Sequence, residues 1–380
     1  MAGPVRVLEL LVSTELGGGP AHVRDLVRGL AGPEFELTVA GPGGGALVEG
    51  LRVAGAEFVP LAADRLSIGA LLRTIRLARS RRVQVIHSHG KGAGLYGRIA
   101  ARLTGAAAIH TFHGIHHAGY GSLYLRLERV LARQSFAVVH VSPSQAAEAR
   151  ALGLAPPGRS RVIVNGVDAS AVRAAAADAP LSREQLGLRA DALVLGTVAR
   201  FDPIKRLEVL VRALPLVLAR VPEAQLLVVG DGPERDALVG LARALDSGGR
   251  IVLPGAIPDA ARVMPLIDLY VSASRREGLP LALLEAMACE RPVVATRVPG
   301  HVDAVEEGVT GHLVPVDDVD RLAAVAVGLL RDPARRSALG RAGRARVERH
   351  FSRARMLEEI AHLYRKAAGF PRGEPSRGGV

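Results

Sequence analysis

The stretch "DLYVSASRREGLPLALLEAMACERPVVATR", residues 268–297, passes from an apolar segment through a polar loop into a helical segment and then into a second apolar segment. Short apolar runs separated by a helix are typical of parallel strands joined by a crossover helix. Pro280 is suited to the start of that helix. The stretch therefore predicts a strand–helix–strand unit, with Glu277 in the loop and Glu285 inside the helix.

The same alternation fills the rest of the chain. Apolar segments that we expect to be strands, with helical periods between most of them, lie at 5–12, 35–40, 83–89, 107–114, 136–142, 192–200, 224–230, 250–255, 268–274, 291–297 and 311–315. The pattern breaks at 165–188, which has no strand signal. This predicts an α/β fold of two doubly wound, Rossmann-like domains. Ligands of such sheets bind beyond the carboxyl ends of the strands, so we expect a site in a cleft where the two domains face each other.

The length and charge of the chain limit its class. At 380 residues it suits two domains, which we place at 1–170 and 185–351, with a disordered tail at 369–380. A net charge of +12 favours an anionic partner, yet aromatic residues make up only 3% and no zinc-finger spacing occurs, which argues against nucleic acid. Without a membrane-spanning run or a signal-peptide pattern, and with Cys289 as its one cysteine, the chain is expected to be cytoplasmic.

Residues 119–134 predict a basic helix. Arg126, Arg129 and Arg133 are spaced to share one face, with Tyr124, Leu127, Val130 and Leu131 broadly on another. Such a helix either rests on an anionic lipid surface, here the inner face of the membrane, or simply covers the sheet as a solvated helix. The sequence leaves both interpretations open.

Glycine-rich loops follow two of the expected strands. Gly17, Gly18 and Gly19 precede one helix, and Gly230 and Gly232 precede another. Glycine permits a positive φ and close approach of the backbone to a ligand, although a flexible connection explains such loops equally well. Asp231, between two of these glycines, suits either a helix cap or a ligand contact.

Two cations are expected at the carboxyl edge of the second sheet. Arg200 ends a predicted strand, and Lys205 opens the following helix in a chain that otherwise writes nearly all its cations as Arg. A diphosphate takes a forked contact from arginine and a point charge from lysine. The alternative is a pair of ordinary surface cations.

The two glutamates of the opening stretch flank the start of a helix. Unpaired N–H groups at Gly278, Leu279 and Leu281 would favour an anion there. Glu277 and Glu285, roughly 8 Å apart along the helix axis, could then hold two hydroxyl-bearing groups on either side of a phosphate. This layout fits a nucleotide sugar, whereas a structural role would have Glu277 balance the helix dipole and Glu285 pair with an arginine.

Histidines crowd the first half of the chain, at His87, His89, His110, His113, His116 and His117. We expect no metal site here, because neighbouring residues of a strand face opposite sides and no carboxylate or thiolate joins them in the sequence. His113, at the end of a strand, is well placed to contact a substrate. Asp318 and Asp320 form a DxD pattern that is more simply a helix cap than a metal site.

Together these motifs resemble those of the retaining nucleotide-sugar glycosyltransferases of family 4, whose fold is termed GT-B. The resemblance rests on "GGGPAHV", "HTFHG", "VIVNGVD", "GTVARFDPIKRLEVL", "VVGDGPERDAL", "EGLPLALLEAMACERPVVAT" and "RHFS". It implies that the last helix, 352–368, crosses back to the N-terminal domain, which binds the acceptor, while 185–351 binds the donor. The stretches around the histidines are most similar to members that build bacterial surface polysaccharides on lipid-linked acceptors.

The resemblance also implies roles for particular residues. Arg200 and Lys205 would bind the donor diphosphate and stabilise the leaving nucleotide. Glu277 would hold hydroxyls of the transferred sugar, Glu285 those of the ribose, and His113 would contact the sugar or the acceptor. The residues implied in donor binding are Gly18, Gly19, Arg200, Lys205, Gly230, Glu277, Gly278, Leu279, Leu281 and Glu285. Neither a metal nor another cofactor is expected.

The interpretation is thus a peripheral enzyme that moves a sugar from a nucleotide sugar, with UDP favoured over GDP, to a glycan or lipid-linked acceptor in polysaccharide biosynthesis. Two alternatives remain. A UDP-sugar 2-epimerase has a similar two-domain fold and would need no acceptor. A non-catalytic scaffold of a polysaccharide assembly complex would not turn over the donor.

Overall fold

A seven-stranded parallel sheet forms the framework of the first part of the chain. The computed structural model describes residues 3–15, 17–45, 47–62, 67–115, 121–178, 181–245 and 248–369, and its order of strands in this sheet is β3-β2-β1-β4-β5-β6-β7. The strands are β1 (Val5–Leu11), β2 (Phe35–Gly41), β3 (Glu57–Pro60), β4 (Val85–His89), β5 (Ala107–Phe112), β6 (Ala137–His140) and β7 (Ser160–Val162). The order reverses direction at β1, as a doubly wound sheet requires.

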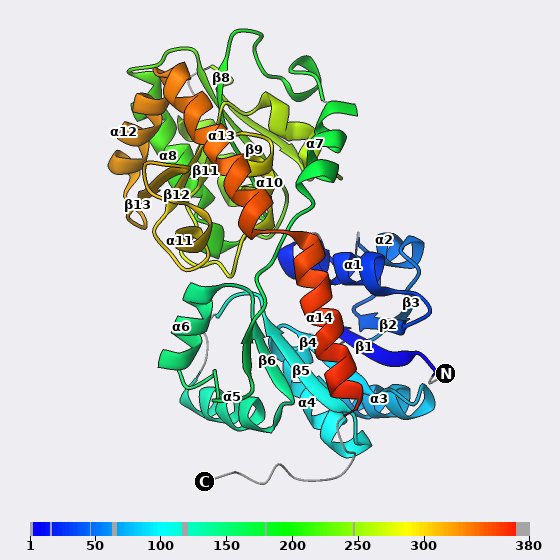
Figure 1. The fold of residues 1–380 in the computed structure, drawn as a ribbon. Helices are drawn as coiled ribbons and strands as arrows, with labels where there is room; N and C mark the ends of the chain where they lie inside the picture. The colour runs from blue at the N-terminus through cyan, green and yellow to red at the C-terminus, as the bar shows by residue number, and fades with distance from the viewer. Residues whose placement is uncertain are drawn as a thin grey trace. The chain divides into compact units, whose positions relative to one another are not determined.

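Helices cover both faces of this sheet (Figure 1). They are α1 (Gly18–Leu30), α2 (Val48–Val53), α3 (Ile68–Ser80), α4 (Lys91–Thr104), α5 (Ser122–Gln134) and α6 (Pro143–Ala151), joined by the last helix, α14 (Arg353–Ala368). Val7, Val85 and Ile109 pack with Ile360 and Tyr364 of α14 on one face. Leu8, Ile86 and Tyr96 are buried in a second cluster with residues of α3 and α4. The strands are apolar on both faces because both faces are covered.

A second parallel sheet has six strands in the order β10-β9-β8-β11-β12-β13. These are β8 (Leu193–Val198), β9 (Ala224–Val229), β10 (Ile251–Gly255), β11 (Leu269–Ser272), β12 (Val293–Thr296) and β13 (Gly311–Val314). Its helices are α7 (Ala169–Asp178), α8 (Leu207–Leu218), α9 (Arg235–Leu245), α10 (Leu281–Ala288), α11 (His301–Ala304), α12 (Val319–Leu330) and α13 (Pro333–His350), with 3-10 turns η2 (Glu184–Leu186), η3 (Pro203–Lys205) and η4 (Ala260–Leu266).

Backbone contacts divide the chain into two compact units. Unit 1 comprises Met1–Asn165 and Arg353–Val380, and unit 2 comprises Gly166–Ser352. In Figure 1 α13 belongs to unit 2 and α14 packs on the sheet of unit 1. The chain thus leaves unit 1 near Asn165 and returns to it at Arg353.

Elements with weak sequence patterns account for the differences from expectation. The edge strands β3 and β7 have only four and three residues, too few for a periodic signal. The segment 165–188 contains α7 and η2, so it is not without structure. Within the described residues, no helix combines the length and the apolarity that crossing a membrane requires. Of the predicted tail 369–380, only Gly369 lies within the described residues.

Candidate functional site

Loops at the carboxyl edge of the second sheet bring together three of the predicted residues. Arg200 follows β8 by two residues, and Lys205 ends η3 in the same loop. Glu277 lies in the loop between β11 and α10, and β11 is the direct neighbour of β8. The parallel pairing of β8 with β11 therefore places both loops at one edge, as the sequence predicts.

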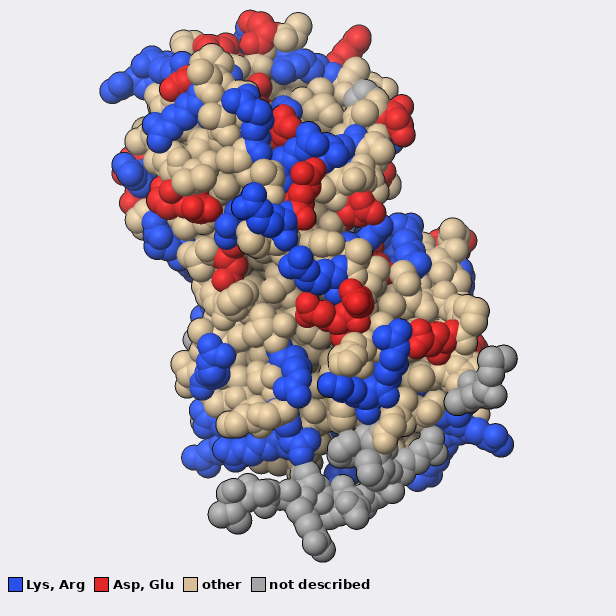
Figure 2. Space-filling view, viewed as in Figure 1, with Lys and Arg blue, Asp and Glu red and all other residues tan. Residues whose placement is uncertain are grey.

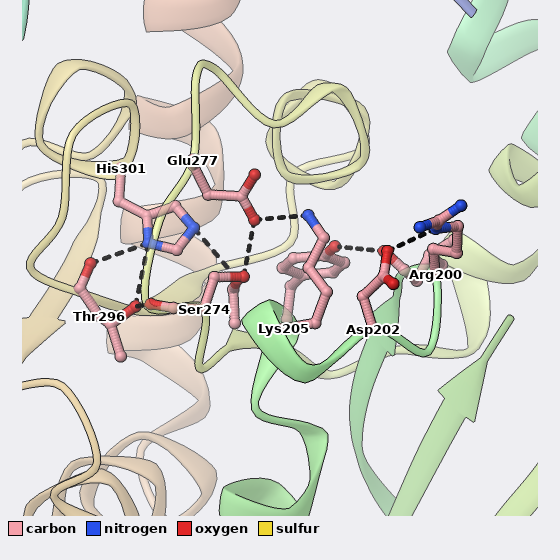
Figure 3. A network of polar contacts seen from close by, with 10 residues as sticks. Arg200, Asp202, Lys205, Ser274, Glu277, Thr296 and His301 are labelled. Carbon is pink, nitrogen blue, oxygen red and sulfur yellow. Dashed lines mark hydrogen bonds and ion pairs between the residues drawn. The ribbon is translucent and has the colours of Figure 1, made fainter. Parts of the chain in front are cut away.

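Lys205 and Glu277 form the central ion pair of this edge (Figure 3). The Lys205 Nζ donates to Glu277 Oε1 over 2.6 Å, and the Ser274 hydroxyl donates to the same oxygen over 2.6 Å. No described residue donates to Glu277 Oε2, so this oxygen can still accept hydrogen bonds. The Glu277 side chain is only 10% exposed, which makes the pair stronger than a surface ion pair.

The surroundings of Glu277 keep it ionised. Burial alone would raise the pKa of its carboxyl, but the Lys205 charge, the His301 ring and the two hydrogen bonds hold that pKa below the ordinary value. Glu277 is therefore an anion and an acceptor at neutral pH. Lys205 begins no helix, contrary to expectation, because α8 starts at Leu207 after Arg206 turns the backbone with φ 52°.

Arg200 is held by a neighbouring carboxylate. Its Nε donates to Asp202 Oδ2, and the Arg200 side chain is 41% exposed. Figure 3 shows Arg200, Asp202 and Lys205 in sequence beside Glu277. Because the pair is partly exposed, an incoming anion can compete with Asp202 for the guanidinium at small cost.

Helix α10 presents its N-terminus at the same edge. The helix begins at Leu281, with Pro280 as its N-cap rather than in its first turn. The backbone N–H groups of Gly278, Leu279 and Leu281 donate to no other residue in the described part of the chain, so an anion could accept from them. The Glu285 side chain lies half-buried a little more than one turn further along.

Gly300 explains how the Gly278 loop comes so close to the neighbouring turn. Gly300 has φ 79°, and a Cβ at this position would lie 2.5 Å from the Gly278 carbonyl oxygen. A larger residue would therefore displace the loop that carries the predicted donor contacts. The turn after β12 thus fixes the backbone around Gly278.

Gly230 is required by packing within the protein. It has φ 143°, and a Cβ there would lie 1.8 Å from the Ala199 carbonyl oxygen, next to Arg200. Its N–H already donates to Gly255 O over 2.9 Å. Gly230 therefore supports the Arg200 loop by close backbone approach, and its amide is not available for a phosphate.

Sequence reasoning missed the polar residues that support Glu277. His301 is buried and accepts from the Ser272 hydroxyl at Nε2 over 3.1 Å, while its Nδ1 donates to Thr296 O over 2.8 Å. Burial lowers the pKa of His301, which favours this neutral form, although the charge of Glu277 opposes the shift. The signal available was a histidine one residue after a glycine turn, which is too common to single out.

The aspartates interpreted as caps differ in outcome. Asp318 caps α12 by accepting from the Arg321 N–H over 2.8 Å, as expected. Asp231 is no helix cap, because α9 begins only at Arg235 and the Asp231 carboxylate accepts from the Gly232 N–H over 2.8 Å.

In unit 1, Gly19 and His113 lie against each other. A Cβ on Gly19 would lie 3.4 Å from His113 Cδ2, and nothing lies within 4 Å of the corresponding position on Gly18. The expectation of positive φ at Gly17, Gly18 and Gly19 is wrong, because α1 already begins at Gly18 and Gly17 has an extended φ of 170°. The glycines instead leave the N-terminus of α1 uncovered beside His113.

A carboxylate does join the histidines, which corrects the expectation that none would. Glu9 is fully buried and is paired in register with His87 on the adjacent strand. His87 and His89 are two residues apart, so they share a face, and both lie near Glu9. The sequence hid this contact because Glu9 lies 78 residues before His87.

Two groups of these side chains were tested as metal sites. Glu9, His87 and His89 bring one ligand atom each to within 4.8 Å of the others, as do His22, His89 and His113. In the first group the two ring nitrogens of His87 and of His89 are occupied by hydrogen bonds, which disfavours a metal. His22 keeps two buried nitrogens without a partner. His116 and His117 lie outside the described residues.

Helix α5 is only partly as expected. Arg129 turns inward and donates to Leu152 O over 2.8 Å, so it leaves the predicted basic face. Leu127 and Val130 do not face the sheet but are 38% and 46% exposed, as is Leu123 at 79%. Arg126 and Arg133 are exposed at matching helical positions, so one face combines two arginines with three aliphatic side chains.

Comparison with known proteins places the chain in a family. The model described as "Glycosyltransferase Family 4" matches residues 16–171, and that of "Glycosyl transferases group 1" matches residues 192–332. A D-inositol 3-phosphate glycosyltransferase of Thermobispora bispora is 33% identical over 323 residues, covering 79% of this chain and 74% of the relative. A second, from Segniliparus rotundus, is 29% identical over 360 residues, covering 88% and 76%.

Solved structures share the fold. HepE of Anabaena, in complex with UDP and glucose, has a TM-score of 0.84 and 22% identity, and the match covers 95% of this chain and 100% of that chain. Sucrose-phosphate synthase of Thermosynechococcus elongatus has a TM-score of 0.80 and 25% identity, with 95% and 98% covered. The fold is GT-B, with two Rossmann-like domains. With these matches over both halves, the chain belongs to glycosyltransferase family 4 and is a glycosyltransferase.

Proposed function

We propose that this glycosyltransferase transfers a sugar from a UDP-sugar with retention of anomeric configuration and without a metal ion. The observation that carries the proposal is the ion pair of Lys205 with Glu277 beside Arg200, at the carboxyl edge of the second sheet. Two cations and a partly free carboxylate suit a ligand that is anionic at one end and rich in hydroxyls at the other.

The leaving group determines what the cations do. Cleavage of the bond between sugar and diphosphate leaves negative charge on the diphosphate, and stabilising this charge lowers the barrier. Arg200 would offer two parallel N–H groups once Asp202 is displaced, and Lys205 a compact ammonium. The N-terminus of α10 adds backbone N–H donors. These three sources of positive charge replace what a divalent cation would supply.

The glutamates orient the hydroxyl-bearing parts of the donor. Glu277 Oε1 is occupied by Lys205 and Ser274, so Oε2 would accept from hydroxyls of the transferred sugar. Glu285 would accept from the ribose hydroxyls. Glu277 stays bound to Lys205 and serves to bind the sugar rather than to attack it. Retention would then follow from attack of the acceptor on the face that the diphosphate leaves, with a phosphate oxygen taking the acceptor proton.

Two relatives support the donor. HepE was solved with UDP and glucose and with UDP-glucose, and the same fold covers 95% of this chain. A more distant glycosyltransferase, TarM, was solved with UDP, with a TM-score of 0.65. No comparison favours the UDP-sugar 2-epimerase or the scaffold over a transferase.

We further propose a lipid-linked acceptor at an anionic membrane surface. The exposed face of α5 carries Leu123, Leu127 and Val130 beside Arg126 and Arg133. Figure 2 shows blue side chains gathered at the lower left, where Figure 1 draws α5. Aliphatic side chains flanked by arginines suit the boundary between acyl chains and headgroups.

The donor can be identified by thermal shift. At 100 times its dissociation constant, a ligand that binds only the folded state adds about 2.7 kcal/mol to its stability. We expect UDP and UDP-sugars to raise the melting temperature more than GDP- or ADP-sugars do, with the same shifts when EDTA is present. A shift seen only with GDP-sugars, or one abolished by EDTA, would contradict the proposal.

Substitutions at the carboxyl edge should separate transfer from binding. We expect Glu277→Gln to lower kcat by about 100-fold or more, since it removes the anion that orients both Lys205 and the sugar. Arg200→Ala should weaken UDP binding about tenfold to 100-fold, as measured by calorimetry, because a charged hydrogen bond to the diphosphate is lost.

Arg189→Ala is the matched control for Arg200→Ala. Arg189 is paired with Asp191 at 3.3 Å, as Arg200 is with Asp202, but it lies before β8 at the opposite edge of the sheet. It should leave UDP affinity within about twofold, as for a surface ion pair. Equal losses in the two arginine variants, or full activity in Glu277→Gln, would refute the site.

Membrane contact can be measured by flotation with vesicles. We expect binding to vesicles that contain phosphatidylglycerol and little binding to pure phosphatidylcholine. Charge reversal of Arg126 and Arg133 to Glu should reduce it at least tenfold, since each basic residue contributes about 1 kcal/mol near an anionic surface. The same reversal at Arg212 and Arg243, exposed on helices of unit 2, is the control. Equal binding by both variants would argue against α5.

A further inference from the structure

Glu9 lies at the centre of a buried hydrogen-bond network that the reaction described above does not use. It is fully buried, and the Tyr364 hydroxyl donates to its Oε1. The other oxygen, Oε2, lies 2.8 Å from His89 Nε2. His89 Nδ1 in turn lies 2.9 Å from His113 Nε2. An unbroken chain of contacts therefore links the Glu9 carboxylate to the ring at the end of β5.

The direction of each hydrogen bond follows from the carboxylate. An ionised carboxylate only accepts, so His89 must carry its proton on Nε2 and donate to Glu9. A neutral imidazole has one proton, which leaves His89 Nδ1 without one. His89 Nδ1 can then only accept, and the proton between the two rings must be that of His113 Nε2. His113 Nδ1 is consequently left with a lone pair.

The other side of the network agrees with this assignment. Because Tyr364 donates its proton to Glu9, its oxygen accepts from His87 Nδ1 over 2.6 Å. His87 Nε2 then accepts from the Thr111 hydroxyl over 2.7 Å. Every donor has one acceptor, and both branches converge on the Glu9 carboxylate. No alternative tautomer of His87 is needed to satisfy the network.

The surroundings favour neutral rings. The N-terminus of α1, with its partial positive charge, lies against His113 through Gly19, which disfavours an imidazolium. Burial lowers the pKa of His89 to about 4 and that of His113 well below its usual range. Burial alone would raise the pKa of Glu9, but its histidine neighbours and their hydrogen bonds hold that pKa below the ordinary value.

We propose that Glu9 is a positioning residue that acts through His89 to hold His113 as the Nε2–H tautomer, so that His113 Nδ1 accepts a hydrogen bond from a substrate hydroxyl. In the described residues nothing donates to this Nδ1. The Cδ2 edge of the ring faces Gly19, so Nδ1 lies on the edge turned away from it. The role in transfer rests on the proposed function, whereas the tautomer does not.

Nitrogen NMR of the full-length protein tests the tautomer directly. Long-range proton–nitrogen correlation on protein labelled with 15N-histidine distinguishes a protonated ring nitrogen from a bare one, and the signals of His113 are assigned by their loss in His113→Gln. We expect a bare Nδ1 and a protonated Nε2 on His113, without any ligand bound. A proton on Nδ1 would overturn the proposal, whatever the enzyme transfers.

Substitution of Glu9 tests its influence on the ring. Glu9→Gln offers one oxygen to two donors, so we expect the His113 signals to show a mixed or reversed tautomer and kcat to fall at least tenfold. The affinity for UDP, a ligand assigned to unit 2, should stay within about twofold, which shows that the protein is folded. Thr111→Val removes only the far end of the other branch and should leave the His113 tautomer unchanged.

Two results would contradict this account. Unchanged His113 signals together with unchanged kcat in Glu9→Gln would show that the carboxylate does not act on His113. Alternatively, stoichiometric Zn²⁺ that raises the melting temperature and removes the proton from His113 Nε2 would show that His22, His89 and His113 are metal ligands rather than a hydrogen-bonded pair beside a third ring. A wild-type protein that transfers no sugar would refute the proposed function and leave the tautomer result standing.

Discussion

Every strand pair that the structure describes in the two sheets is parallel, and this constraint determines where chemistry can occur. In a parallel sheet all the carboxyl ends meet at one edge, so residues far apart in the sequence become neighbours. In unit 2 this brings Lys205 to Glu277, 72 residues further along the chain. In unit 1 it brings Glu9, His89 and His113 into one hydrogen-bonded series.

The two edges differ in electrostatic character, which suits two different tasks. The edge of unit 2 combines exposed cations with a buried anion, so it can hold a charged ligand and retain its own geometry. The edge of unit 1 has neutral rings backed by a buried carboxylate, so it can offer acceptors to hydroxyls. A charged diphosphate and an uncharged sugar require these two kinds of surface.

Much of this could be predicted from the sequence, since parallel strands are apolar on both faces and their loops carry glycine and proline. The strand–helix alternation and the loops of Arg200, Lys205 and Glu277 follow from local patterns. The role of Gly230 could not, because it depends on an approach to Ala199 from another loop. Nor could the position of Glu9, since the partners of a buried carboxylate lie on other strands and on α14, out of reach of any local pattern.

The most direct test of the central claim is a crystal structure of the protein with UDP bound. The account predicts a diphosphate within hydrogen-bond distance of both Arg200 and Lys205, and the ribose hydroxyls beside Glu285. A nucleotide bound away from the loop 277–285, with the Lys205 and Glu277 side chains making no contact to it, would contradict the account.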